Sequence, residues 1–207
     1  MNYVQGKSAS PGIAFGVVYK YHKTLMIIPA ERKGSLQEER KRVDDALAIA
    51  KEELKELMHH VEGKMGDDLA QIFRAQLTMT EDEDFIMTVL ENLASTSMCA
   101  EQALQAACDE YAQLFDELGD GDYNKQRLSD LQDVCDRLLR ILLGVTQVTL
   151  SEVPEHSIIF AEELLPSDTV EMDKDHIKGI VVCKGGVTSH VAILAKTLGI
   201  PASVGTD

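Results

Sequence analysis

The chain has 207 residues, of which 44% are apolar and 27% are charged, as in an ordinary water-soluble globular protein. Its 35 acidic and 20 basic side chains give a formal net charge of −15, which disfavours nucleic acid and anionic lipid and favours a basic partner. No apolar run reaches the roughly 20 residues that cross a bilayer, so we expect no membrane span and a cytoplasmic location. The four cysteines form no CxxC pair, so we expect reduced thiols and no metal or redox motif.

The first part of the chain, residues 1–30, is a mixture of short β-type runs and breaks at Gly and Pro. The runs "GVVYKY" (16–21) and "LMIIP" (25–29) are rich in β-branched and aromatic residues and predict two strands. Thirty residues are too few to bury a core. We therefore expect these strands to pair with strands from residue 145 onward, with a separate N-terminal hairpin as the alternative.

The middle of the chain, residues 34–144, has the pattern of successive helices. Ser35 and Glu38 have the spacing of a capping box, in which each side chain bonds the other's backbone amide. The helices are amphipathic, so they need partners, and we expect an antiparallel bundle rather than the alternative, a coiled-coil dimer. Apolar residues at steps of three and four define the faces Val43–Val61, Leu69–Leu77, Phe85–Leu93, Leu104–Leu118 and Leu131–Ile141.

The last part of the chain, residues 145–207, returns to an α/β pattern. The runs "SIIFA" (157–161) and "GIVV" (179–182) predict buried strands, and "HVAILAKTLG" (190–199) predicts a helix that ends at its Gly. The predicted fold is therefore an α/β subdomain formed by both chain ends, residues 1–30 and 145–207. The helical bundle, residues 34–144, is inserted between its two parts.

One histidine lies where a predicted strand turns into a predicted helix. Two glycines and two hydroxyl residues precede His190, and the start of a helix offers unpaired N–H groups, so the turn is suited to an anion. A neutral imidazole beside a bound phosphate can accept a phosphoryl group, and we expect this ring to face solvent. The alternative is a capping or surface histidine. The predicted phosphate-binding residues are Gly185, Gly186, Thr188 and Ser189.

Four stretches in the same order resemble one family, Enzyme I, the phosphoenolpyruvate (PEP)–protein phosphotransferase of the bacterial sugar phosphotransferase system. The match covers nearly the whole chain. Its N-terminal stretch and its helical region separate it from other phosphohistidine enzymes. The four stretches are "ASPGIAFG" (9–16), "DYNKQRLSDLQDVCDRLLR" (122–140), "LLPSDT" (164–169) and "GGVTSHVAILAKTLGIPA" (185–202).

The resemblance implies that His190 accepts a phosphoryl group from PEP and passes it to the small phosphocarrier HPr. It implies that Thr169 orients the imidazole or its phosphoryl group; a simple turn residue is the alternative. It places HPr on the helical subdomain, where an acidic surface can steer a basic carrier, although a solvated acidic face is the alternative. The residues expected at that surface are Asp67, Asp68, Leu77, Met79, Glu81, Asp82, Glu83, Asp84 and Arg127.

Two residues and the length depart from the family pattern. Val187 and Gln132 stand where the family usually has Arg. The region that binds PEP and Mg²⁺ in Enzyme I is not in this sequence, so we expect no metal or cofactor in this chain and reaction with PEP only together with that region. We expect the chain to be part of a longer protein, with a natural short homologue as the alternative. Alone it should be a monomer, and at full length a homodimer.

Other functions remain as alternatives. One is the swivelling phosphohistidine domain of a pyruvate phosphate dikinase or PEP synthase. Another is the shortened Enzyme I-like module of a dihydroxyacetone kinase. A third, from a different class, is a non-catalytic helical scaffold that binds a partner through its acidic face.

Overall fold

The computed structural model describes most of the chain, and the helices, strands and contacts are those of the described residues. The described residues are 4–32, 34–62, 67–95, 97–117, 119, 121–146, 149–170 and 172–206. The side chains of Asp67, Asp68 and Asp122 are outside the description.

The chain divides into two compact units. One unit joins residues 1–23 to residues 148–207, and the other consists of residues 24–147. The first contains a sheet and the second contains helices, so the predicted fold class, an α/β part from both chain ends with an inserted helical part, is confirmed. The division into subdomains at residues 1–30 and 145–207 and at residues 34–144 stays a prediction.

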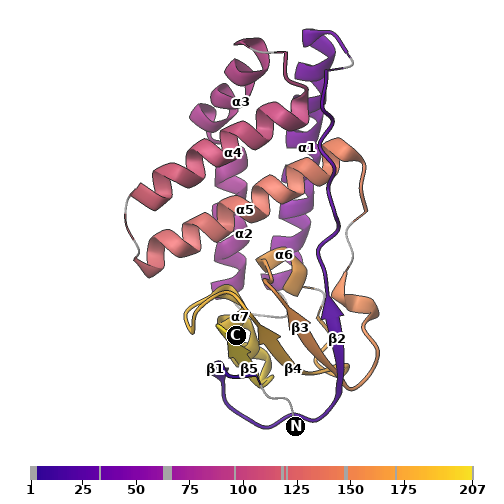
Figure 1. Ribbon diagram of the computed structural model, residues 1–207, viewed down its shortest axis with the longest axis vertical. Coiled ribbons are helices and arrows are strands. Elements are labelled where there is room, and N and C mark those ends of the chain that lie inside the picture. The colour runs from indigo at the N-terminus through magenta and orange to yellow at the C-terminus, as the bar shows by residue number, and fades with distance from the viewer. Residues whose placement is uncertain are drawn as a thin grey trace. The chain divides into compact units, whose positions relative to one another are not determined.

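The first unit is built on one five-stranded sheet with the strand order β1-β5-β4-β3-β2 (Figure 1). The strands β2 to β5 pair in parallel, and β1 pairs antiparallel with β5. The N-terminal strands therefore take both edges of a sheet whose centre comes from the C-terminal part, as expected. The strands are β1 (Lys7–Ser10), β2 (Val17–Tyr21), β3 (Ser157–Ala161), β4 (Ile177–Val182) and β5 (Ala202–Val204).

Two helices of this unit position the candidate site. The helix α7 (His190–Leu198) contacts β1 and β5, and the single-turn helix α6 (Pro166–Thr169) contacts α7. The apolar face of α7 is fully buried at Leu194 and Ala195, and Gly199 ends the helix in a left-handed conformation (φ 67°) that glycine adopts without strain. A short 3₁₀ turn, Leu150–Glu152, precedes β3.

The second unit consists of five helices, with α1 packed along α2 and α4 along α5. The predicted capping box at the start of α1 is confirmed: the Ser35 amide donates to Glu38 Oε2 (2.7 Å) and the Glu38 amide to Ser35 Oγ (3.3 Å). The helices are α1 (Leu36–Glu62), α2 (Asp67–Thr80), α3 (Glu83–Ser95), α4 (Ala100–Glu117) and α5 (Asp122–Leu143). Among the described residues, no helix is both long and apolar enough to span a membrane.

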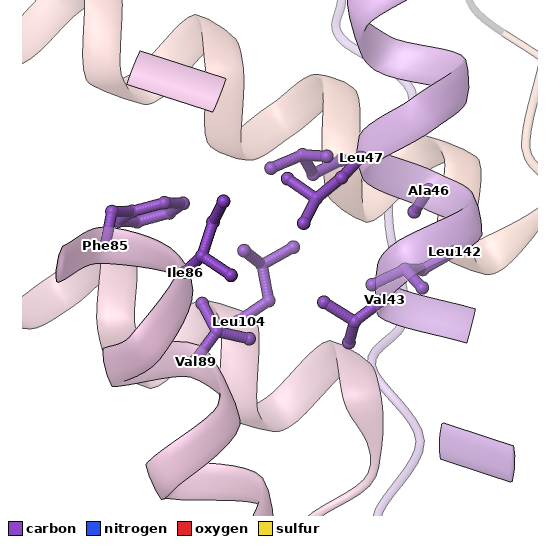
Figure 2. Close-up of a pocket in the computed structure, with 9 residues that line it drawn as sticks. Val43, Ala46, Leu47, Phe85, Ile86, Val89, Leu104 and Leu142 are labelled. Carbon is purple, nitrogen blue, oxygen red and sulfur yellow. The ribbon is translucent and has the colours of Figure 1, made fainter. Parts of the chain in front are cut away.

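The helical unit is held by a continuous apolar core between α1, α3, α4 and α5. Figure 2 shows side chains from these helices pointing toward one small cavity of about 10 Å³. The residues around it are apolar, with Phe85, Val89 and Leu104 almost completely buried. A space of this size is close to a single water molecule and has no polar group to hold one, so we interpret it as a packing defect.

Charged groups tie α1 to the ends of α4 and α5. The Arg42 guanidinium donates to Glu39 Oε2 (2.8 Å), to both carboxylate oxygens of Glu101 and to the Leu142 carbonyl (3.0 Å). Glu39 also accepts the Ala100 amide (2.8 Å). Both carboxylates are buried, so this arginine neutralises charges that water cannot reach.

One predicted strand is wrong. Residues 25–29 form no strand, although their run of apolar residues is typical of one. Met26 and Ile28 pack against the helical core, while Leu25 and Ile27 are exposed. The segment therefore lies extended along the helices, and the helical core rather than a neighbouring strand covers its buried side chains.

The expectation of reduced thiols is also wrong for two of the four cysteines. Cys108 of α4 and Cys135 of α5 form a disulfide, while Cys99 and Cys183 are free thiols. The two partners are 27 residues apart, and only the packing of α4 along α5 brings them together.

Candidate functional site

The strand β4 leads into the turn that carries His190. Gly185 has a φ of 94°, a conformation that disfavours any side chain, and the Ser189 amide donates to the Gly186 carbonyl (3.0 Å) to close the turn. Ser189 is the N-cap of α7, where its hydroxyl accepts the Ala192 amide (3.4 Å). His190 is therefore the first residue of a helix, beside the positive end of the helix dipole.

The expectation that the His190 ring faces solvent is wrong. The side chain is buried, with 6% of its surface exposed, whereas Gly185, Gly186 and Thr188 before it are exposed. Val187 is 42% exposed, and its carbonyl accepts the Lys196 ammonium (3.4 Å), which bridges the turn to the helix. The turn can therefore receive a ligand from solvent, but the ring is covered in this conformation.

Thr169 lies on the short helix that contacts α7. It is 1% exposed, and its hydroxyl donates to the Pro166 carbonyl (2.7 Å). The helix contact brings the "LLPSDT" stretch and the His190 helix together, as the family resemblance implies for these residues. The hydroxyl is used within its own turn, so the orienting role of Thr169 stays a prediction.

Sequence reasoning missed two residues that hold α6 in place. The Tyr21 hydroxyl of β2 donates to Asp168 Oδ1 (2.7 Å), and Asp168 Oδ2 accepts the Leu165 amide (2.8 Å). Both side chains are buried. An acid three residues after the N-cap of a helix is a known cap signal, but no local pattern points to a tyrosine 147 residues away.

We expect Tyr21→Phe to destabilise the α/β unit by about 1–3 kcal/mol, because it leaves a buried carboxylate without its hydroxyl donor. The measurement is thermal or urea unfolding followed by circular dichroism. Tyr19→Phe, two residues earlier in the same strand, is the matched control and should change stability little. Equal effects of the two changes would contradict the role assigned to the Tyr21–Asp168 bond.

The helical unit contains a groove of about 400 Å³ that collects several of the residues predicted at a carrier surface. Met79 and Arg127 both line it, together with Asp82. The Arg127 guanidinium lies 5.2 Å from the centre of the Tyr123 ring, and its Nε donates to the tyrosine oxygen (3.2 Å). The remaining lining residues are Ala75, Thr78, Phe85, Tyr111, Phe115, Leu131 and Val134.

The predicted acidic residues lie where α2 passes into α3. Glu81, Glu83 and Asp84 are exposed there, and Asp82 caps α3 by accepting the Phe85 amide (2.9 Å). Leu77 is half-buried on α2 but does not line the groove. Asp67 and Asp68 begin α2, and their side chains lie outside the described part. Of these four successive acidic residues, Asp82 lines the groove, and its sequence neighbours Glu81, Glu83 and Asp84 are exposed.

In the described part of the chain, no group of three or more His, Cys, Asp or Glu side chains is placed to hold a metal ion. The turn at the candidate site offers an imidazole, hydroxyls and backbone amides.

Comparison with known families covers both units. Residues 5–127 match the family described as PEP-utilising enzyme, N-terminal, and residues 153–207 match PEP-utilising enzyme, mobile domain. The chain belongs to the PEP-utilising enzymes. His190 and its turn lie within the mobile-domain match of this family, and the groove residues up to Arg127 lie within the N-terminal match.

Curated relatives confirm the resemblance to Enzyme I. The phosphoenolpyruvate–protein phosphotransferase of Bacillus subtilis is 36% identical over 206 residues, and that of Enterococcus faecalis is 36% identical over 208. These matches cover 100% and 98% of the chain but only 36% and 35% of the relatives. The chain thus spans about a third of the length of these PEP-utilising enzymes.

Solved structures agree with the fold of this part of Enzyme I. A solution NMR structure of an Enzyme I protein has a TM-score of 0.77 at 35% identity and covers 98% of this chain and 82% of its own. The N-terminal domain of Enzyme 1 - Nitrogen has a TM-score of 0.63 at 26% identity, with coverage of 99% and 84%.

Proposed function

We propose that this chain is the phosphotransfer part of an Enzyme I, in which His190 carries a phosphoryl group between PEP and the phosphocarrier HPr. The observation that carries the proposal is the Gly-Gly turn between β4 and α7, with His190 at the start of the helix. Gly185, Gly186, Thr188 and Ser189 then surround the phosphoryl oxygens with amides and hydroxyls. Phosphoryl transfer requires that both partners reach the His190 ring. Because the ring is buried in this conformation, it must become exposed during transfer.

The reaction with the carrier is an exchange between two histidines. The P–N bond of phospho-HPr breaks, a new P–N bond forms to one ring nitrogen of His190, and the carrier imidazole keeps the electron pair of the broken bond. The protein supplies position and charge stabilisation rather than a further covalent group. Because Val187 stands in place of the usual arginine, the backbone amides and hydroxyls of the turn must position the phosphoryl group and stabilise its charge.

We assign HPr to the groove on the helical unit. Its apolar floor, the Arg127 guanidinium and the acidic run from Glu81 to Asp84 suit a carrier that presents basic groups around an apolar patch. Binding of PEP and Mg²⁺ belongs to the rest of the longer protein, which would also form a homodimer, whereas this part acts as a cytoplasmic monomer. The separate roles of Asp67, Asp68 and Leu77 in this surface remain predictions.

Incubation of the chain with two different phosphoryl donors tests the proposal. Incubated with phospho-HPr, the chain should gain the mass of one acid-labile phosphoryl group, and with PEP and Mg²⁺ alone it should gain none. Intact mass spectrometry at neutral pH measures both. A failure to exchange with phospho-HPr would overturn the transfer function. A gain from PEP alone would overturn the assignment of PEP to the rest of the protein.

A further inference from the structure

A cluster of buried polar groups lies between α2 and α5, next to the groove. Asp130 and Asp133 of α5 are 4% and 2% exposed, and Gln76 of α2 is fully buried. The Gln76 amide nitrogen donates to Asp133 Oδ2 (3.0 Å). Two acids one helical turn apart are thus held in the interior, where charge is costly.

The groove begins at the same cluster. Asp130 Oδ2 lies 3.8 Å from Nη1 of Arg127, one turn earlier on α5. The Asp130 side chain is 6% exposed and that of Arg127 is 32% exposed, so the pair reaches from the interior to the groove. An ion pair of this kind is weakly screened and restricts the rotamers of the long arginine side chain.

We propose that Asp130 is a positioning residue: its carboxylate, together with Tyr123, holds the Arg127 guanidinium at the groove, and protonation of Asp130 removes the ion pair and weakens capture of HPr. The inference rests on the proposed function, because it assumes that HPr binds this groove. Holding a rotamer-rich side chain in advance of binding improves affinity by about 2- to 10-fold.

The surroundings of Asp130 favour a proton near neutral pH. Burial raises the pKa of its carboxyl to about 7; the Arg127 charge lowers this pKa, the Asp133 carboxylate raises it and a hydrogen bond with Gln76 lowers it. The carboxyl is therefore neutral below about pH 7 and charged above it. The ion pair with Arg127 exists only in the charged form.

The ionisable groups described below, on the helices around α5, do not take the place of Asp130 as the partner of Arg127. From α1, Glu53 accepts hydrogen bonds from Arg137 (2.6 Å) and from Arg140. From α4, Tyr111 lines the groove, and burial raises the pKa of its hydroxyl, so it stays neutral near pH 7. From α2, the uncharged Gln76 faces the two acids. Neither Glu53 nor Tyr111 therefore supplies the counter-charge that Asp130 gives Arg127.

The test is isothermal titration of HPr into the chain and into Asp130→Asn at pH 6 and pH 8. At pH 8 the variant should bind about 2- to 10-fold more weakly than the wild type, and at pH 6 the two should bind alike. Protonation of the histidine of HPr affects binding to the wild type and to the variant equally, so it cancels in the ratio of their two dissociation constants at each pH. Asp45→Asn, an exposed acid of α1 paired with Lys41, controls for the loss of one negative charge and should give a pH-independent ratio.

A ratio for Asp130→Asn that does not change with pH would overturn the inference while leaving HPr binding in place. A ¹³C NMR titration of the free chain in which the Asp130 carboxyl is ionised throughout pH 6–8 would overturn it as well. If the wild type binds no HPr at either pH, the proposed function itself is wrong, and this inference falls with it.

Discussion

Replacing His190 with alanine is expected to reduce phosphoryl exchange with phospho-HPr on the order of 10³-fold or more, below detection by intact mass spectrometry. The imidazole is the only group of the turn that forms a stable P–N bond at neutral pH, so no neighbour can substitute for it. The helical circular dichroism should be preserved, because alanine is accepted at the start of a helix and α7 keeps its Ser189 cap.

His176→Ala is the matched control for this experiment. His176 is in the same unit just before β4, and its Nδ1 lies 3.0 Å from the Val153 carbonyl. The control should accept phosphate as the wild type does. Exchange that persists in His190→Ala, or that disappears in both variants, would contradict the assignment of the acceptor.

Replacing Arg42 with methionine is expected to cost about 3–5 kcal/mol of the free energy of unfolding, because two buried carboxylates lose their counter-charge. Glu39 and Glu101 have side chains that are 4% and 2% exposed, so water cannot take over the role of the guanidinium. Methionine keeps much of the stem that packs on the helices, so the loss reports the charge and its hydrogen bonds. Urea unfolding at pH 7, followed by circular dichroism because the chain has no Trp, measures it.

Lys41→Met is the control one residue earlier on α1. Lys41 pairs with Asp45 on the exposed surface, where such a pair contributes about 0.3–0.5 kcal/mol. A loss at Arg42 that is no larger than the loss at Lys41 would show that the buried cluster does not stabilise the unit.

The pH dependence of the Arg42 effect has a defined sign. Burial raises the pKa of Glu101, but the hydrogen bond and charge of Arg42, together with hydrogen bonds from Cys99 and the backbone, outweigh burial and hold this pKa below the ordinary 4.5. A carboxyl with a lowered pKa stabilises the folded state above its unfolded pKa, and that contribution is lost as the pH falls through the folded pKa. The difference between wild type and Arg42→Met should therefore be full at pH 7 and shrink below about pH 4.5.

Local patterns in the sequence predicted most of the fold. Steps of three and four between apolar residues identified the faces of α1 to α5, and β-branched runs identified β3 and β4. The prediction of a strand at residues 25–29 was wrong for a physical reason. Met26 and Ile28 pack against helices while Leu25 and Ile27 are exposed, and a run of apolar residues indicates neither which of them is buried nor what covers it.

Parts of the candidate site depended on contacts that no local pattern contains. The turn before His190 was recognisable from Gly-Gly and the helix that follows. The bond between Tyr21 and Asp168, and the disulfide between Cys108 and Cys135, arise only when distant segments pack together. The burial of the His190 ring has the same origin, because a sequence reports which residue begins a helix but not what lies over it.

The order of strands in the sheet has a consequence for synthesis on the ribosome. Each N-terminal strand pairs with a strand from beyond the helices: β2 with β3, and β1 with β5. The helices are translated before either partner, so they can assemble while β1 and β2 have no neighbour to bond. The sheet can close only after residues 202–204 have left the exit tunnel, which places the histidine turn among the last parts of this unit to reach its final conformation.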